Sequence, residues 1–319
     1  MPKSNTAIYV SSLKKSYQDK KVLKNVTFSV PSGSIYALLG SNGAGKTTAI
    51  RILTTQIKAD SGDVQIEGYH ITKQAEKIHK IISLTGQFAA VDETLTGKEN
   101  LFIMAQLYHL PNPEKRACEL LEDFGLSASA DLFVSTYSGG MKRRLDIAMS
   151  LVGNPSIIFL DEPTTGLDPQ SRRSMWNTIQ ELKESGVTIF LTTQYLEEAE
   201  ELADMIAILD NGEIIAEGTP AQLKAYLPQG ALEFVFDNTK TLELATTLLA
   251  DYKLSLLPEE HKLTIFTDGS TTTLTEIFHK FYQHKLNLQH FSQLTPNLED
   301  VFLSMIAESE DIQNENKKI

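Results

Sequence analysis

The chain has 319 residues, 41% of them hydrophobic, and a formal net charge of −12 at pH 7. This length suggests about two domains, and the apolar fraction is ample for packed cores, which excludes a globally disordered protein. The acidic balance argues against nucleic-acid binding, because proteins that bind phosphate backbones normally present a basic face.

The compartment is indicated by the cysteine content and by the lengths of the apolar runs. The lone cysteine, Cys118, excludes an intramolecular disulfide bond, and its helical context predicts a buried or half-buried thiol. The first residues lack the apolar core of a signal peptide, and no window approaches the roughly 18 uninterrupted apolar residues that span a bilayer. We therefore expect a cytoplasmic or peripheral protein that has no direct membrane span.

The first two thirds of the chain alternate short apolar runs with amphipathic segments, which predicts an α/β fold. The expected strands are 7–13, 22–30, 35–39, 63–66, 78–84, 156–160, 187–192, 205–209 and 213–217. Asp210-Asn211-Gly212 joins the last two as a tight hairpin, because these residues tolerate positive φ. Helical periodicity in 98–110, 113–124 and 139–151 predicts a helical insertion over about 88–152.

The composition changes near Leu227-Pro228-Gln229-Gly230, which predicts a domain boundary between residues 228 and 229. The next segments repeat a strand–helix order, with strands at 231–236, 262–267 and 286–291 and helices at 242–251, 273–282 and 297–307. They predict a small α+β accessory domain over 229–308. Residues 309–319 are polar and charged, and we expect them to be disordered.

Residues 40–47 fit the G-x-x-x-x-G-K-[ST] pattern of a phosphate-binding loop, between a buried strand, 35–39, and a helix, 47–56. Glycines let successive backbone N–H groups curl around phosphates, and the helix N-terminus favours anions. Lys46 is expected to reach the outer phosphates of ATP, and the Thr47 hydroxyl to bind Mg²⁺. The candidate nucleotide-binding residues here are Gly40, Ser41, Asn42, Gly43, Ala44, Gly45, Lys46, Thr47 and Thr48.

An apolar strand ends in two acidic residues, Asp161 and Glu162. Ligand chemistry on open α/β sheets lies at the carboxyl ends of the strands, where this pair falls. Asp161 is expected to hold Mg²⁺, directly or through water, and Glu162 to orient and deprotonate the attacking water.

Tyr137-Ser138-Gly139-Gly140-Met141 precedes a helix, where Ser138 can cap the first turn and two glycines expose its N–H groups to an anion. With these motifs in this order, the chain closely resembles the ATPase subunits of ABC transporters, whose usual signature is LSGGQ. The resemblance implies a P-loop NTPase fold of the ABC type with a helical insertion. It also implies a dimer in which Ser138, Gly139 and Gly140 of one chain face ATP on the other.

The resemblance assigns three further positions. Tyr17 occupies the place of the aromatic residue that stacks on adenine, although a lone tyrosine can equally serve packing. Gln87 matches the glutamine that senses Mg²⁺ and the γ-phosphate, and Asp168 matches the loop that meets the partner chain. Asp168 also precedes Pro169, as a helix cap does, and the two roles are compatible.

Gln194 departs from the family pattern, which usually places a histidine there against the γ-phosphate. Glutamine donates a hydrogen bond but carries neither a proton nor a charge. Drug-resistance exporters of the family also have glutamine at this position, so we expect a working but slower hydrolase.

Two segments, 92–101 and 298–302, resemble bacterial exporter ATPases of the daunorubicin-resistance type. That type implies a homodimer at the cytoplasmic face of the cell membrane, driving a separate integral membrane permease that exports drugs, lipids or other hydrophobic compounds. Residues 87–101 would form the permease docking surface. A soluble ABC ATPase of translation, repair or cofactor assembly stays open as an alternative, as does a weakly hydrolysing regulatory nucleotide binder.

Overall fold

The computed structural model describes residues 6–87, 89–226, 230–268, 270–294, 298–299 and 301–302. It divides the chain into two compact units, Met1–Pro220 and Ala221–Ile319, with the division slightly before the expected boundary at 228. The tail 309–319 lies outside the described residues, as does most of the expected helix 297–307. No helix in the described ranges has the length and apolarity needed to cross a membrane.

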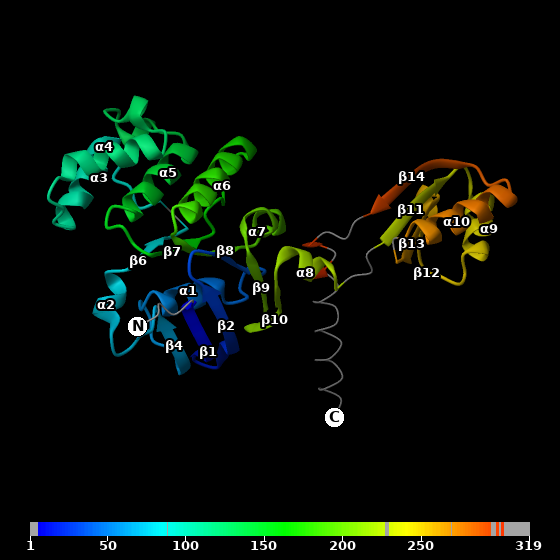
Figure 1. Ribbon diagram of the computed structural model, residues 1–319, viewed down its shortest axis with the longest axis horizontal. Helices are drawn as coiled ribbons and strands as arrows, with labels where there is room; N and C mark the ends of the chain where they lie inside the picture. Colours follow the sequence, from blue (N-terminus) through cyan, green and yellow to red (C-terminus); the bar gives the residue numbers. More distant parts are fainter. Residues whose placement is uncertain are drawn as a thin grey trace. The chain divides into compact units, whose positions relative to one another are not determined.

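A largely parallel sheet forms the centre of unit 1, in the order β10-β9-β3-β8-β7-β6 (Figure 1). The strands are β3 (Ile35–Leu39), β6 (Ile82–Thr85), β7 (Ile157–Asp161), β8 (Thr188–Thr193), β9 (Met205–Asp210) and β10 (Glu213–Gly218). Strands β3, β7 and β8 are buried throughout, which explains their uninterrupted apolar sequences. Because β3, β7 and β8 run parallel to one another, their carboxyl ends meet at one edge of the sheet.

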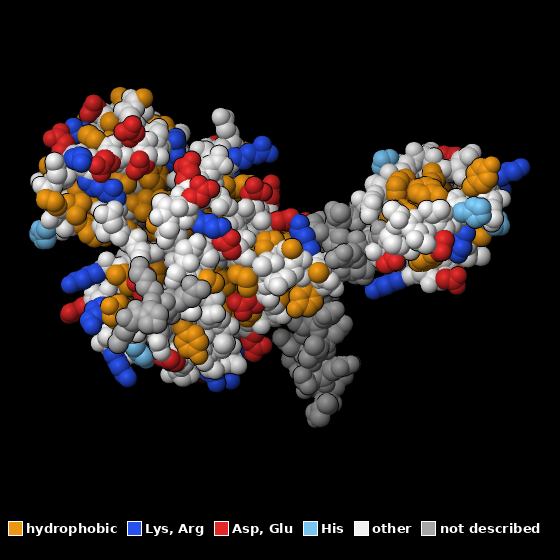
Figure 2. All heavy atoms as spheres, viewed as in Figure 1, with side chains coloured by type: hydrophobic (Ala, Val, Ile, Leu, Met, Phe, Trp, Pro, Cys, Tyr) orange, Lys and Arg blue, Asp and Glu red, His pale blue; other side chains and the backbone are white. Residues whose placement is uncertain are grey.

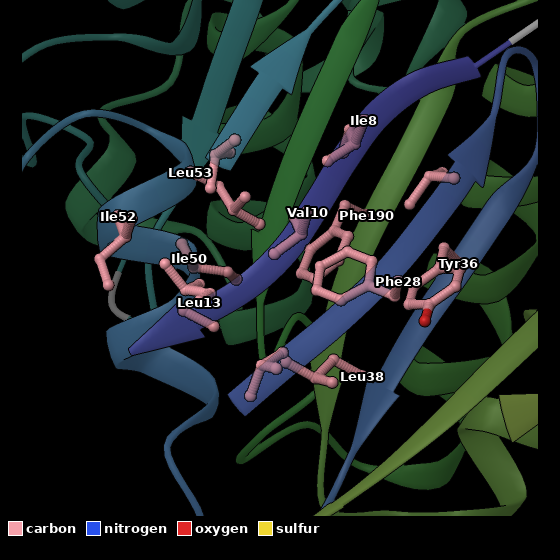
Figure 3. Packing of buried hydrophobic residues seen from close by; sticks show 14 of the residues in the cluster. Ile8, Val10, Leu13, Phe28, Tyr36, Leu38, Ile50, Ile52, Leu53 and Phe190 are labelled. Atoms are coloured by element: carbon pink, nitrogen blue, oxygen red, sulfur yellow. The ribbon is translucent and has the colours of Figure 1, made fainter. Parts of the chain in front are cut away.

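A second, antiparallel sheet packs against this one, in the order β2-β1-β4-β5. It consists of β1 (Thr6–Tyr17), β2 (Lys20–Pro31), β4 (Ser61–Ile66) and β5 (Tyr69–His70). One hydrophobic cluster joins both sheets and helix α1 (Lys46–Leu53), and Figure 3 shows Phe28, Tyr36 and Phe190 gathered at its centre. Their ring centroids lie 5.2–5.7 Å apart, so aromatic stacking ties one sheet to the other.

The helical insertion contains α3 (Gly97–Leu107), α4 (Pro113–Asp123) and α5 (Gly139–Ser150), which lie together in Figure 1. Short 3₁₀ turns at Ser127–Ser129 and Val134–Thr136 connect α4 to α5. Each long helix starts at a polar cap, and the cap of α3 is a reciprocal pair between Thr96 and Glu99. Helices α6 (Pro169–Glu184), α7 (Leu196–Leu202) and α8 (Pro220–Lys224) follow later in the chain.

The structure corrects two sequence expectations in unit 1. The expected strand 78–84 is the end of a short helix, α2 (Ala75–His79), followed by β6. Ile78 is buried in that helix, and its apolar side chain made the apolar run of β6 look as if it began at residue 78. The Cys118 thiol is exposed rather than buried, because α4 buries Ala117 and Leu120 on a different face.

Unit 2 has the chain order β-α-β-β-α-β and an antiparallel sheet ordered β12-β13-β11-β14, which is the ferredoxin-like arrangement. Its elements are β11 (Gly230–Phe236), α9 (Thr239–Leu248), β12 (Lys253–Leu257), a 3₁₀ turn (Pro258–Glu260), β13 (Lys262–Thr267), α10 (Thr271–Gln283) and β14 (Leu288–Leu294). Phe234 of β11 packs edge-on against Phe281 of α10, with ring centroids 5.0 Å apart. Strand β12 was not expected from the sequence, because it is a largely exposed edge strand without a buried face.

Candidate nucleotide-binding site

The loop between β3 and α1 has a backbone that only glycine accommodates readily. Gly43 and Gly45 have φ angles of 86° and 116°, in the left-handed region. A Cβ atom on Gly45 would lie 2.8 Å from Leu23 Cδ2, and one on Gly40 would collide with the Leu209 carbonyl. The loop can therefore lie flat on the sheet edge, while residues 41–43 stay exposed to a ligand.

Lys46 is buried beneath this loop at the first turn of α1. Its Nζ donates hydrogen bonds to the carbonyls of Gly40 at 2.8 Å and Ser41 at 3.2 Å. The same nitrogen lies 3.3 Å from Glu162 Oε1 in an ion pair. The lysine thus joins the phosphate loop to the acidic end of β7.

Asp161 and Glu162 are both buried at the carboxyl end of β7 and are held by Thr192 of β8. The Thr192 hydroxyl donates to Asp161 Oδ1 at 2.5 Å, and the Glu162 N–H donates to the Thr192 carbonyl at 3.1 Å. Thr47 Oγ1 lies 3.5 Å from the same Asp161 oxygen. Glu162 has a φ of 48°, which is uncommon outside glycine and is typical of functional sites.

The two glutamines differ in how they relate to this acidic pair. Gln87 is exposed at the end of β6, and its Nε2 lies 3.5 Å from Glu162 Oε2, which also accepts a hydrogen bond from Thr165 at 3.2 Å. Gln194 is half-buried two residues beyond Thr192, and it follows Thr193, whose carbonyl accepts the Gly40 N–H at 3.2 Å. Both glutamines therefore lie on loops that border the phosphate loop or Glu162.

Ser138 and Asp168 cap neighbouring helices. The Ser138 hydroxyl accepts from the Met141 N–H at 3.3 Å, and Asp168 accepts from the N–H groups of Gln170 and Ser171 at 3.0 and 2.9 Å. Hydrogen bonds, the largest effect being that of the Ser171 hydroxyl, hold the pKa of the Asp168 carboxyl below its usual value.

Gly140 keeps α5 close to α6, since a Cβ atom there would lie 2.7 Å from the Ser171 hydroxyl. Ser138 and Gly139 are exposed, and no hydrogen bond among the described residues joins them to the phosphate loop. Tyr17 is also exposed, at the end of β1, with Lys15 Nζ 5.4 Å from its ring centroid. One face of the Tyr17 ring is therefore accessible to a ligand.

A buried ion pair on α5 was not expected from the sequence. Arg143 and Asp146 are 5% and 6% exposed, and their charged groups are 3.2 Å apart. Arg143 also donates to backbone carbonyls next to Gln87 and Glu162. The only signal in the sequence is a pair of opposite charges three residues apart, which is usual on exposed helix faces.

Glu198 of α7 is a second missed residue, fully buried four positions after Gln194. Its Oε1 accepts hydrogen bonds from Thr164 Oγ1 at 2.7 Å and from Trp176 Nε1 at 3.4 Å. Burial raises the pKa of this carboxyl above its usual value. In the sequence, Glu198 is one of several similar glutamates in a short acidic helix, so nothing distinguishes it.

Comparison with known proteins gives a consistent result. Residues 23–165 match the family described as ABC transporter. The chain is 39% identical to the daunorubicin/doxorubicin resistance ATP-binding protein DrrA of Streptomyces peucetius, over 96% of this chain and 94% of that protein. It is 36% identical to the linearmycin resistance ATP-binding protein LnrL of Bacillus subtilis, over 95% of this chain and 97% of that one. A dimeric ATP-binding cassette, MJ0796, bound to ADP and Pi, superposes with a TM-score of 0.60 at 26% identity, over 66% of this chain and 98% of its own.

Proposed function

Because this chain belongs to the ABC transporter ATP-binding proteins and is an ATPase of that class, we propose that it works as a homodimer that powers a separate membrane permease. The observation that carries the proposal is the meeting of two motifs, the phosphate loop and the acidic pair, at one sheet edge. Lys46 of the phosphate loop pairs with Glu162, and Thr47 lies beside Asp161. ATP hydrolysis needs these groups together, because it depends on positioning and on electrostatic stabilisation.

The residues at this edge fit ATP with Mg²⁺. The glycine-rich loop provides backbone N–H groups and a helix N-terminus for phosphates, and Lys46 provides a cation. Thr47 and Asp161 provide a hydroxyl and a carboxylate oxygen, the hard ligands that Mg²⁺ prefers, with Gln87 at the rim. When bound, Mg²⁺ would neutralise phosphate charge, Glu162 would hold and deprotonate the attacking water, and Gln194 would donate a hydrogen bond.

A second chain is needed to use the signature residues. Ser138 and Gly139 are exposed, and they begin a helix whose free N–H groups favour an anion. Asp168 lies close by, at the start of the adjacent helix. We propose that these residues complete the ATP site of a second copy, and the dimeric cassette among the similar structures supports this arrangement.

We further propose that the permease docks on the helical insertion, with residues 87–101 as the predicted surface, so that the chain lies at the cytoplasmic face of the membrane. Figure 2 shows hydrophobic side chains among charged ones over this part of unit 1. Ile103 and Leu107 continue helix α3 beyond this segment, and Phe133 pairs with Thr96 inside it. These three side chains are 40%, 68% and 57% exposed, which suits an apolar partner helix. The resistance proteins among the relatives support export of drug-like hydrophobic compounds.

The partner is tested by purifying the tagged chain from membranes of its native cell in mild detergent. Recovery of a protein with several membrane spans, in near-equal amount, supports the transporter subunit. Recovery from the cytosol alone, or with ribosomes or assembly factors, contradicts it and favours a soluble ATPase.

The chemistry is tested on the purified chain with Glu162→Gln. Loss of a general base lowers hydrolysis by about 100-fold or more, while ATP binding persists. Chelation of Mg²⁺ by EDTA should stop hydrolysis, and added Mg²⁺ should restore it. Undiminished hydrolysis by Glu162→Gln would contradict the assignment of Glu162.

A further inference from the structure

We propose that Arg143 and Asp146 are a positioning pair that transmits the placement of the signature helix α5 to the chain's own hydrolytic residues. The inference rests on the proposed function, because it requires that a second chain's nucleotide engages Ser138 and Gly139. Binding at one ATP site would then set the geometry around Gln87 and Glu162 of the other.

Arg143 holds the backbone on both sides of Glu162. Its Nε donates to the Pro163 carbonyl at 2.9 Å, and one terminal nitrogen lies 3.4 Å from the Asp161 carbonyl. The other terminal nitrogen donates to the Gly86 carbonyl at 2.5 Å, directly before Gln87. One guanidinium therefore connects the two segments that carry Glu162 and Gln87.

Asp146 completes the arrangement from the same helix. Its Oδ2 pairs with Arg143 at 3.2 Å, and its Oδ1 accepts the N–H of Ala90 at 3.0 Å. Gly86 and Ala90 bracket Gln87, so the pair holds both ends of the segment that contains it. Helix α5 therefore contacts the segment that contains Gln87 through both Arg143 and Asp146, and the segment that contains Glu162 through Arg143 alone.

The path from the signature to this pair is short and continuous. Ser138 caps α5, and Arg143 follows five residues later on the same helix, about 7.5 Å along its axis at 1.5 Å per residue. Gly140 lets the start of α5 lie against α6. A shift of the first turn of α5 therefore moves the guanidinium, and with it the carbonyls next to Gln87 and Glu162.

The buried Arg143–Asp146 ion pair is not explained by a contribution to folding stability alone. Burial lowers the pKa of Arg143 and raises that of Asp146, so each charge loses hydration when the chain folds. Well-packed apolar residues of similar volume often stabilise a protein as well as a buried ion pair does. Lysine cannot replace the arginine here, because three nitrogens in a planar fork reach separate carbonyls.

These properties define the test, a double variant with Arg143→Met and Asp146→Leu. The matched control replaces an ion pair in unit 2, Glu233 and Lys262, 3.3 Å apart and half-buried, with Glu233→Leu and Lys262→Met. Urea unfolding, ATP binding with EDTA present, and hydrolysis over a range of ATP concentrations are measured on the full chain.

We expect the Arg143 and Asp146 double variant to fold and to bind ATP within about twofold of the unmodified chain, with kcat at least tenfold lower, because small misplacements of catalytic groups have effects of this size. We expect the unmodified chain to hydrolyse ATP with a Hill coefficient above 1 and the double variant with one of about 1, since binding at one site no longer reaches the other. The control should keep both values.

Three outcomes overturn the inference: kcat within twofold of the unmodified chain, an unchanged Hill coefficient, or losses of ATP binding and of activity in equal proportion. If the double variant does not fold, Arg143→Lys is measured by the same criteria, because it keeps the charge and loses the fork. An unmodified chain that neither hydrolyses ATP nor dimerises would instead contradict the proposed function.

Discussion

Replacing Thr192 with valine tests how the acidic pair is held. Thr192 is fully buried, and its hydroxyl donates to Asp161 Oδ1 at 2.5 Å. A hydrogen bond to a charged group contributes about 1.5–3 kcal/mol, and valine keeps the shape while losing this bond. The Glu162 N–H keeps its bond to the Thr192 carbonyl at 3.1 Å, but it loses the one that it also donates to the Thr192 hydroxyl at 3.2 Å. We therefore expect unit 1 to lose about 2–3 kcal/mol of unfolding free energy.

The chain offers both a probe and a control for this measurement. The only tryptophan, Trp176, is buried in α6, so its fluorescence reports the unfolding of unit 1 in urea. The midpoint for Thr192→Val should fall by about 1 M, at an m-value of about 2–3 kcal/mol/M. Thr188 on the same strand accepts a bond from the neutral Gly33 N–H at 2.9 Å, so Thr188→Val should lose only about 1 kcal/mol. Equal midpoints for the two variants would refute this reasoning.

Three further predictions concern the phosphate loop, Gln194 and Glu198. Gly45→Ala should weaken ATP binding at least about tenfold in equilibrium dialysis, because Gly45 has a φ of 116° and its added Cβ would contact Leu23. Gly33→Ala is the control, since Gly33 also has a positive φ but lies outside the phosphate loop, and it should bind ATP normally. Equal binding by both variants would contradict this prediction. Gln194→Ala should lower kcat while ATP binding persists, and an unchanged kcat would remove Gln194 from the mechanism. Burial raises the pKa of Glu198, so the folded chain holds this proton more tightly and loses stability as pH rises above about 4.5, the value in the unfolded chain, toward the raised pKa. The difference in urea midpoint between Glu198→Gln and the unmodified chain should therefore shift in favour of the variant as the pH rises above about 4.5, and a constant difference would contradict the burial argument.

The sequence was sufficient to predict those parts of the site that lie in continuous motifs. Strand 35–39, the loop after it and the acidic end of β7 were expected from apolar runs and glycine spacing, and the structure brings Lys46 and Glu162 together. These features depend on local backbone geometry and on the rule that parallel strands share one carboxyl edge.

The buried charges could not be predicted in the same way. Arg143 and Asp146 have the spacing of an ordinary surface pair, and their partners are carbonyl and N–H groups of distant segments, which carry no residue-type signal. Strand β12 was missed because an exposed edge strand has no apolar alternation. In each case the deciding contact is tertiary, and it leaves no period in the sequence.

The left-handed backbone at Glu162 has a consequence for how mutants at this position are interpreted. With φ at 48°, the position tolerates glycine and, at modest strain, unbranched side chains, but a β-branched residue is a genuine outlier there. An inactive valine or threonine variant would therefore report a distorted turn as readily as a missing base. Glutamine keeps the branching and length of the side chain and alters only its acid–base chemistry, so it is the substitution that isolates the role of the carboxylate. When natural chains are compared, the first question about a residue at this position is whether it tolerates a left-handed backbone, and only then whether it carries a charge.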